Sequence, residues 1–285
     1  MCNTIGLTDE EFGILMDETQ HCSFMSEQLA IFIKEGLAGD HDAMIDAIDL
    51  MKEEGKLYRY PNSVLGKIYT SFLKRLIDAH SDDDDDCDFW LLDLGLAYEG
   101  GMGVAQDVNE AIRCYERIAK NGWSVGNECL GTIYLLGRGV PVDYEKAFHY
   151  FTIDDEHSDV TTNYYLGEMY RQGLYIEKNE EVACRYFEKK VYDDDNPSQS
   201  DITYWRACYR LGVAKHYGWG TEKNFEEAWR LINNAKLYRD DLLNTTDDLI
   251  LLQTNNLSLD IINDVTEDEL NHELELIDHE AENYR

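Results

Sequence analysis

The chain has 285 residues, of which 44% are hydrophobic and 12% aromatic, and it contains only three prolines. This composition supplies a continuous apolar core and is typical of packed helices rather than of a disordered chain. The 58 acidic against 25 basic residues give a net charge of −33, which disfavours direct binding to nucleic acid or to an anionic membrane. The same charge would attract a basic partner, or it serves mainly to keep the protein soluble.

The seven cysteines are odd in number, are irregularly spaced and form no Cys-x-x-Cys pair. The first residues lack the basic start and apolar run of a signal peptide, and no stretch approaches the ~18 apolar residues of a membrane span. We therefore expect reduced thiols, no membrane span and a cytoplasmic location.

The first predicted elements are two helices joined by a short turn. A helix over Cys22–Lys34 leads to Gly36, where the chain is expected to turn, and Asp40 is a candidate N-cap. A second helix is predicted over Asp42–Glu54, and Gly55 follows it. We interpret this segment as a degenerate first repeat.

A new repeat is predicted to begin at Leu65-Gly66, with Tyr69 on the same helix face. Only 29 residues separate Gly66 from the next such glycine, so this repeat is cut short or rearranged. The shortened spacing coincides with the run Asp82–Asp86, which is predicted to be a solvated loop. The run lacks the glycine and glutamate of an EF-hand, which disfavours a dedicated calcium site. Residues 1–86 are thus expected to hold degenerate helical repeats with an acidic loop.

Four clearer repeats follow in residues 87–240. A Leu-Gly pair recurs with glycine spacings of 36, 36 and 45 residues, and matching residues follow each glycine at +3, +6, +8, +12, +16 and +20. Such self-similarity is the signature of a repeat architecture. The pairs that define repeats 1 to 4 are Leu94-Gly95, Leu130-Gly131, Leu166-Gly167 and Leu211-Gly212.

Each repeated position has a physical role in a pair of antiparallel helices. The Leu-Gly pair and the tyrosine at +3 form one stripe of a first helix, and the glycine allows close approach of a second helix. The glycines at +6 and +8 are expected to adopt positive φ in the turn, and Asp or Asn at +12 caps the second helix. Alanine at +16 and a large apolar residue at +20 then face the first helix. Because one pair cannot cover its apolar faces, neighbouring pairs must stack.

These residues resemble the Sel1-like repeat family, which is related to the tetratricopeptide repeats. The match is densest over Leu130–Val140, followed by Asp143 and Lys146-Ala147. The resemblance implies an all-α fold, an α/α superhelical solenoid of helix-turn-helix repeats. It also implies a role as an adaptor or binding scaffold.

The C-terminal extension, residues 241–285, is acidic and is predicted to end in an amphipathic helix. Thr266 and Glu269 have the spacing of a capping box, and Leu270, Leu274 and Ile277 share one helix face. We favour a helix that caps the solenoid. The alternative is a segment that folds back into the concave groove or docks onto a partner.

No pattern in the sequence predicts catalysis, a metal site or a cofactor. His272-Glu273 is followed by Leu276 where an HExxH zinc motif needs histidine, and neither a phosphate-binding loop nor a Gly-x-Ser-x-Gly elbow occurs. We therefore expect a non-enzymatic protein without cofactors or metals.

The concave side of the solenoid is the predicted partner site. It should be lined by first-helix residues that point away from the Leu-Gly-Tyr stripe, at about −2, +2 and +5 from each glycine. Tyrosine, tryptophan and arginine are common anchors at interfaces, although such residues also pack between repeats. The predicted lining residues are Trp90, Asp93, Tyr165, Met169, Gln172, Arg210 and Tyr217.

Three functional hypotheses follow from these observations. The first is a scaffold that binds a protein or peptide on its concave face. The second is an acidic decoy that resembles DNA and engages a basic nucleic-acid-binding protein, which the net charge of −33 suggests. The third, an enzyme with an unrecognised site, would require a deep pocket with shifted ionisable groups and ranks lowest.

Overall fold

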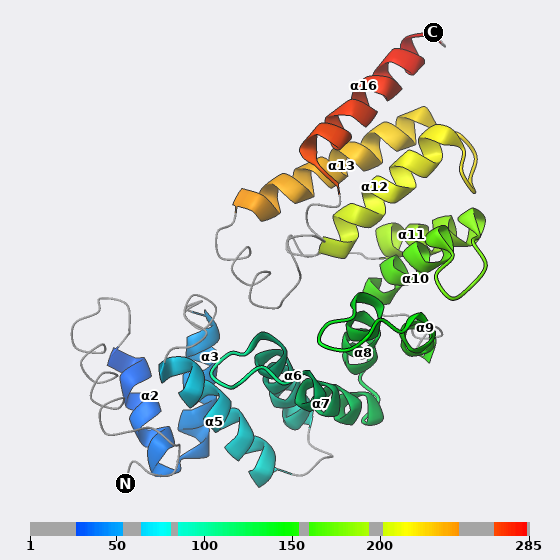
Figure 1. The fold of residues 1–285 in the computed structure, drawn as a ribbon. Coiled ribbons are helices and arrows are strands. Elements are labelled where there is room, and N and C mark those ends of the chain that lie inside the picture. The colour runs from blue at the N-terminus through cyan, green and yellow to red at the C-terminus, as the bar shows by residue number, and fades with distance from the viewer. Residues whose placement is uncertain are drawn as a thin grey trace. The chain divides into compact units, whose positions relative to one another are not determined.

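The computed structural model describes residues 27–53, 64–80, 85–153, 160–193, 202–244 and 265–283 (Figure 1). In this part of the chain all the regular elements are α-helices, as the all-α solenoid class predicts. Residues 82–84 of the predicted loop lie outside the described residues, whereas Asp85 and Asp86 belong to the helix that follows, so the prediction of a loop is wrong for these two. The segment from Asp194 to Asp201 and the apolar clusters after Asn244 also lie outside the described residues. None of the described helices is long and apolar enough to span a membrane.

The chain divides into two compact parts at Gly126–Asn127, inside the repeat array. The N-terminal part contains five helices among its described residues, and the C-terminal part begins within α8. The N-terminal helices are α2 (Glu27–Ala38), α3 (His41–Glu53), α5 (Val64–Ala79), α6 (Asp85–Gly100) and α7 (Val108–Lys120). The others are α8 (Ser124–Leu136), α9 (Tyr144–Ile153), α10 (Val160–Gln172), α11 (Glu180–Tyr192), α12 (Ile202–Tyr217), α13 (Phe225–Asn244) and α16 (Glu267–Asn283).

The first helix pair, α2 and α3, differs from its prediction at the turn. Gly36 lies inside α2, where a Cβ would come within 2.9 Å of the Phe72 ring, so this glycine permits packing and does not form the turn. The turn is made by Gly39, which has φ +111. Asp40 caps α3 as predicted, because the Ala43 N–H donates to its Oδ1 at 3.2 Å.

The described residues of the shortened second repeat form one helix, α5. The motif at Leu65-Gly66 and Tyr69 lies in α5, which packs between α3 and α6 and has no helical partner of its own among the described residues. A Cβ on Gly103, the +8 glycine of repeat 1, would collide with the backbone of Gly66 near the start of α5. In the same way, a Cβ on Gly220, the +8 glycine of repeat 4, would collide with the backbone of Glu180 at the start of α11, which is the second helix of repeat 3. By this comparison α5 occupies the place of a second helix. The prediction that this motif begins a first helix is wrong.

Within each of repeats 1 to 4, the Leu-Gly glycine faces the large residue at +20, as predicted. A Cβ on Gly95 would lie 2.5 Å from Cε1 of Tyr115, and one on Gly212 would lie 2.5 Å from Cγ1 of Ile232. Gly131 and Gly167 meet the rings of Phe151 and Phe187 in the same way. The large residues are fully or almost fully buried, so these contacts form the core of each helix pair.

The turns between paired helices also follow the predicted pattern. The glycines at +6 and +8 have φ near +70, and the side chains at +12 accept hydrogen bonds from backbone N–H groups of the second helix. The backbone N–H at +12 donates to the carbonyl of the residue at +3, for example Asp143 to Tyr134 at 2.9 Å. This bond uses the backbone donor that a capping box would use, and the second helix is capped by the side chain at +12, as predicted.

The last described helix, α16, packs against α13 and α12, with Leu270 and Ile277 buried in the contact (Figure 1). Its capping box is present as predicted, because the Thr266 N–H donates to Glu269 at 2.7 Å and the Glu269 N–H donates to Thr266 Oγ1 at 3.2 Å. The amphipathic helix therefore lies on the last repeat.

Candidate functional site

Two of the seven predicted lining residues, Trp90 and Asp93, lie in the N-terminal part of the chain. Trp90 is buried and its ring packs edge-on against His80 at a centroid distance of 4.8 Å. Asp93 forms an ion pair with Lys52 of α3 at 2.8 Å. Both side chains therefore join α6 to preceding elements.

Two more predicted residues, Tyr165 and Met169, are part of the core. Tyr165 stacks on Phe151 at 5.2 Å, and Met169 is fully buried. The prediction that they face a partner does not fit this structure. The reason is that α10 contacts α9, α11 and α12, and its residues from Thr162 to Met169 are buried.

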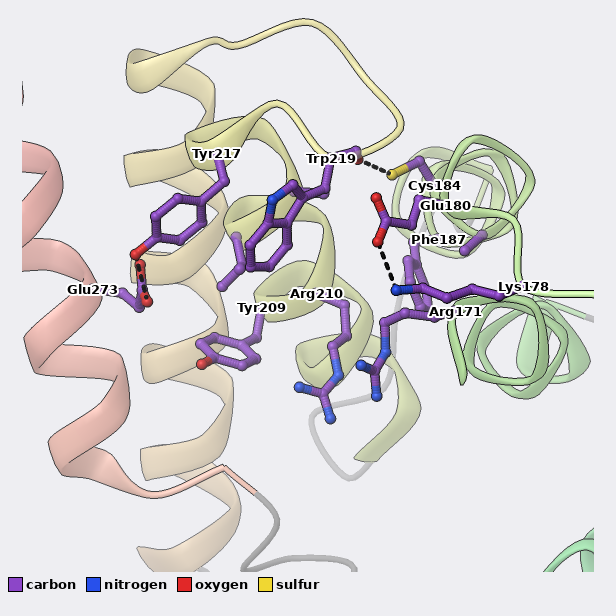
Figure 2. Close-up of a pocket in the computed structure, with 13 residues that line it drawn as sticks. Arg171, Lys178, Glu180, Cys184, Phe187, Tyr209, Arg210, Tyr217, Trp219 and Glu273 are labelled. Carbon is purple, nitrogen blue, oxygen red and sulfur yellow. Dashed lines mark hydrogen bonds and ion pairs between the residues drawn. The ribbon is translucent and has the colours of Figure 1, made fainter. Parts of the chain in front are cut away.

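The remaining three predicted residues lie at or near one pocket of about 460 Å³ in the C-terminal part. Arg210 and Tyr217 line it, and Gln172 is an exposed residue nearby that donates to Glu168 at 2.6 Å. The pocket lies between α11 and α12, and α16 contributes Glu273 to its wall (Figure 2). We call this cavity the Trp219 pocket, after its most exposed aromatic residue. Its lining residues are Arg171, Lys178, Glu180, Ala183, Cys184, Phe187, Tyr209, Arg210, Val213, Ala214, Tyr217, Trp219 and Glu273.

One end of the Trp219 pocket is cationic. The buried carboxylate of Glu168 accepts hydrogen bonds from Arg171 Nη2 at 2.6 Å and from Arg210 Nε at 2.8 Å. Burial alone would raise the pKa of Glu168, but the two guanidinium groups outweigh burial and hold it below its usual value. The carboxylate is thus ionised and fixes both arginine side chains in the pocket wall.

The middle of the pocket is an aromatic platform. The ring of Trp219 stacks on Tyr217 at a centroid distance of 4.8 Å and remains 50% exposed. The backbone carbonyl oxygen of Trp219 accepts a hydrogen bond from Cys184 Sγ at 3.1 Å, which connects the turn between α12 and α13 to α11 (Figure 2). Burial, together with the nearby Glu273, raises the pKa of Tyr217, which donates its hydroxyl hydrogen to Glu273 at 3.3 Å.

The floor of the pocket offers little reactive chemistry. Phe187 and Ala214 are apolar and buried, and burial raises the pKa of the Cys184 thiol to about 11. Such a thiol is protonated at neutral pH and is a poor nucleophile. Among the described residues, no group of three or more His, Cys, Asp or Glu side chains is placed to hold a metal ion. The arrangement therefore suits binding by hydrogen bonds and aromatic contacts.

Sequence reasoning did not identify Arg171, Lys178 and Trp219 as lining residues. Lys178 and Trp219 lie in the turns between paired helices, whereas the prediction considered first helices only. Arg171 lies at +4 from its glycine, one position from the predicted +5. A useful signal would have been Trp219 itself, a large aromatic residue between the two turn glycines Gly218 and Gly220.

Comparisons with known proteins agree with this repeat architecture. Residues 91–123, 130–153, 162–189 and 205–235 match the family model described as Sel1 repeat. The chain is 35% identical over 94 residues to human protein sel-1 homolog 2, a segment that covers 33% of this chain and 13% of the human protein. It is 27% identical over 160 residues to an uncharacterised protein of Neisseria meningitidis serogroup B, covering 54% of this chain and 32% of that one.

Among solved structures, the chain is similar to a Sel1 repeat protein from Oxalobacter formigenes. The TM-score is 0.51 at 19% identity, and the match covers 70% of this chain and 79% of the other. This likeness concerns the fold. The curated relatives are longer, and the matched segments span an eighth to a third of their length.

Proposed function

We propose that this chain, which belongs to the Sel1 repeat family, is a scaffold that binds a segment of a partner protein in the Trp219 pocket. Sel1 repeat proteins generally mediate protein–protein interactions, and their helix pairs typically serve binding rather than catalysis. The observation that carries the proposal is the half-exposed Trp219 ring, held by Tyr217 beside two fixed arginine side chains.

The geometry of the pocket supports this proposal in two ways. Its volume of about 460 Å³ lies within the range of specific ligand sites. Tryptophan, tyrosine and arginine are also the residues that contribute most to binding energy at protein interfaces, particularly when their conformations are fixed beforehand.

The proposal retains part of the predicted partner surface. Arg210 and Tyr217 are proposed as contact residues together with Trp219, and Gln172 as a contact at the edge. Trp90, Tyr165 and Met169 are proposed to support the fold from the core, because they are buried.

A pull-down from lysate of the native host tests the proposal. Tagged wild-type chain, Trp219→Ala and the control Trp229→Ala are compared, with washes at low and high salt and partners identified by mass spectrometry. Trp229 is a matched control because it is 42% exposed on α13 and does not line the pocket. We expect a defined partner that survives high salt and is lost only with Trp219→Ala. Retention of the same partners by Trp219→Ala contradicts the proposal.

The acidic decoy is the second candidate function, and the net charge of −33 favours it. It predicts partners that bind nucleic acid, that are retained only at low salt and that do not depend on Trp219, because charge attraction is screened within ~8 Å at physiological salt. The same pull-down therefore separates the two candidates.

A further inference from the structure

The guanidinium groups of the Trp219 pocket are held in place before any ligand binds. Glu168 accepts from Arg171 Nε at 3.1 Å, from Arg171 Nη2 at 2.6 Å and from Arg210 Nε at 2.8 Å. Because this carboxylate is buried and ionised, it orients the two side chains, one from α10 and one from α12. Arginine that is fixed in this way loses little conformational entropy when it binds an anion.

The balance of charge in the pocket differs from that of the whole chain. Acidic residues outnumber basic ones by 58 to 25 in the sequence, but three basic side chains and only two acidic ones line the pocket. Each of the two carboxylates has another partner. Glu180 binds Lys178 at 2.9 Å, and Glu273 accepts from Tyr217 and lies 3.1 Å from His216 Nδ1.

A further acidic group, on α16, lies within electrostatic reach of the arginine pair. Glu269 on α16 interacts electrostatically with Arg210, but its carboxylate is held by the backbone N–H and hydroxyl of Thr266. The charge of the remaining surface is screened beyond ~8 Å at physiological salt, so the arginine pair governs binding inside the pocket.

The aromatic platform lies beside the arginine pair. Arg171 and Arg210 line the same pocket as Trp219 and Tyr217, and in Figure 2 the two arginine side chains lie below the Trp219 ring. An apolar side chain that covers the exposed half of the Trp219 ring would bring its neighbour in the peptide toward the guanidinium groups. The charged donors are arginine side chains, which suit a side-chain carboxylate. A C-terminal carboxylate is typically captured by backbone N–H groups instead.

We propose that the Trp219 pocket recognises an internal peptide segment of the partner in which Asp or Glu is adjacent to an aromatic or large aliphatic residue. The carboxylate binds Arg171 and Arg210, and the apolar side chain packs on Trp219. This inference rests on the proposed scaffold function and names the chemistry of its ligand.

Selection from a display library of random 12-residue peptides on the immobilised full chain tests the inference. Bound peptides are counter-selected on Arg210→Met, with Arg185→Met as the control, since Arg185 is exposed on α11 outside the pocket. Arg171→Lys serves as a second variant, because it keeps the charge but loses the paired N–H donors. Circular dichroism melts show which variants retain the fold.

We expect enriched peptides that carry an acidic residue next to an apolar one and that depend on Arg210 and Trp219 but not on Arg185. In fluorescence anisotropy, Glu→Gln in such a peptide is expected to weaken binding about 10- to 100-fold, and Arg210→Met by a similar factor. The two losses should not add, because they remove the same contact. Capping the peptide C-terminus as an amide should have no effect.

Three results would overturn the inference, and they bear differently on the scaffold proposal. A consensus rich in Lys or Arg that still depends on Trp219 overturns the acidic-segment inference while supporting the scaffold. Loss of binding on C-terminal amidation assigns the site to chain ends and overturns the internal segment. Enriched peptides that bind equally to Trp219→Ala overturn both the inference and the pocket as the partner site.

Discussion

Gly95→Ala tests whether close helix approach requires the repeated glycine. In the structure a Cβ at position 95 would lie 2.5 Å from Cε1 and 2.9 Å from Cζ of Tyr115, where ordinary contacts begin near 3.4 Å. The ring would therefore have to retreat by about 0.9 Å, the difference between these two distances. Tyr115 is fully buried and donates its hydroxyl hydrogen to Glu99 at 3.1 Å, so the retreat also disturbs a buried hydrogen bond.

The expected loss follows from two opposing terms. Overpacking of a buried contact costs about 1–3 kcal/mol, and loss of a buried hydrogen bond adds about 1 kcal/mol. Alanine in a helix interior recovers about 1 kcal/mol relative to glycine. Gly95→Ala should therefore lower the free energy of unfolding by about 2 kcal/mol.

Urea unfolding followed by circular dichroism measures this change, with Tyr115→Ala and the double variant completing a cycle. Alanine removes the ring that a Cβ at position 95 would meet, whereas an aliphatic side chain such as Ile232 still lies 2.5 Å from a Cβ at the matching Gly212. We expect the double variant to be at least about 1 kcal/mol more stable than the sum of the single losses predicts. If Gly95→Ala were instead stabilised by about 1 kcal/mol, helix propensity alone would account for it and the close-approach explanation would fail.

Three further predictions concern a strained turn, a thiol and a buried carboxylate. Tyr175 has φ +66 and is 56% exposed at a position where the other repeats have glycine. Tyr175→Gly should therefore raise the free energy of unfolding by about 1 kcal/mol, even though it removes the hydrogen bond to Glu145, and thermal melts would measure this change. Cys184 should react with a thiol reagent at pH 7.5 far more slowly than a free cysteine, and its labelling rate should rise as the pH approaches its raised pKa of about 11. Fast labelling in the folded chain at pH 7.5 would contradict the burial of this thiol. Glu168→Gln should lower stability by about 2 kcal/mol at pH 7, because two arginines lose their shared partner. The folded-state pKa of Glu168 lies below that of a free glutamate, so its stabilisation is complete above the unfolded-state pKa and disappears as pH falls through the folded-state pKa. The wild-type and variant unfolding free energies should therefore converge in acid, and a gap that persists would refute the ionised assignment.

Much of the repeat fold could be predicted because its requirements are local. The glycine and the large residue 20 positions later have fixed places on two paired helices, so spacing alone predicts the contact between Gly95 and Tyr115. Positive φ at the turns and the caps at +12 follow from residue type in the same way. The capping box of α16 is equally local, since Thr266 and Glu269 are three residues apart.

Other features depend on contacts between elements that spacing does not encode. The place of α5 is set by its packing against α3 and α6, so its Leu-Gly motif predicted the wrong helix of the pair. Met169 is buried because three other helices surround α10, which no residue pattern on α10 indicates. The arginine pair of the candidate site depends on Glu168, which joins side chains 39 positions apart in the sequence through one buried carboxylate.

The central claim is that a partner binds in the Trp219 pocket, and site-specific photocrosslinking tests it most directly. A photoreactive phenylalanine analogue replaces Trp219 in one chain and Trp229 in another, and each is irradiated in lysate of the native host. The account predicts a discrete partner adduct from position 219, diminished by Arg210→Met, and none from position 229. The same adducts from both positions, or adducts at 219 that are unaffected by Arg210→Met, would contradict it.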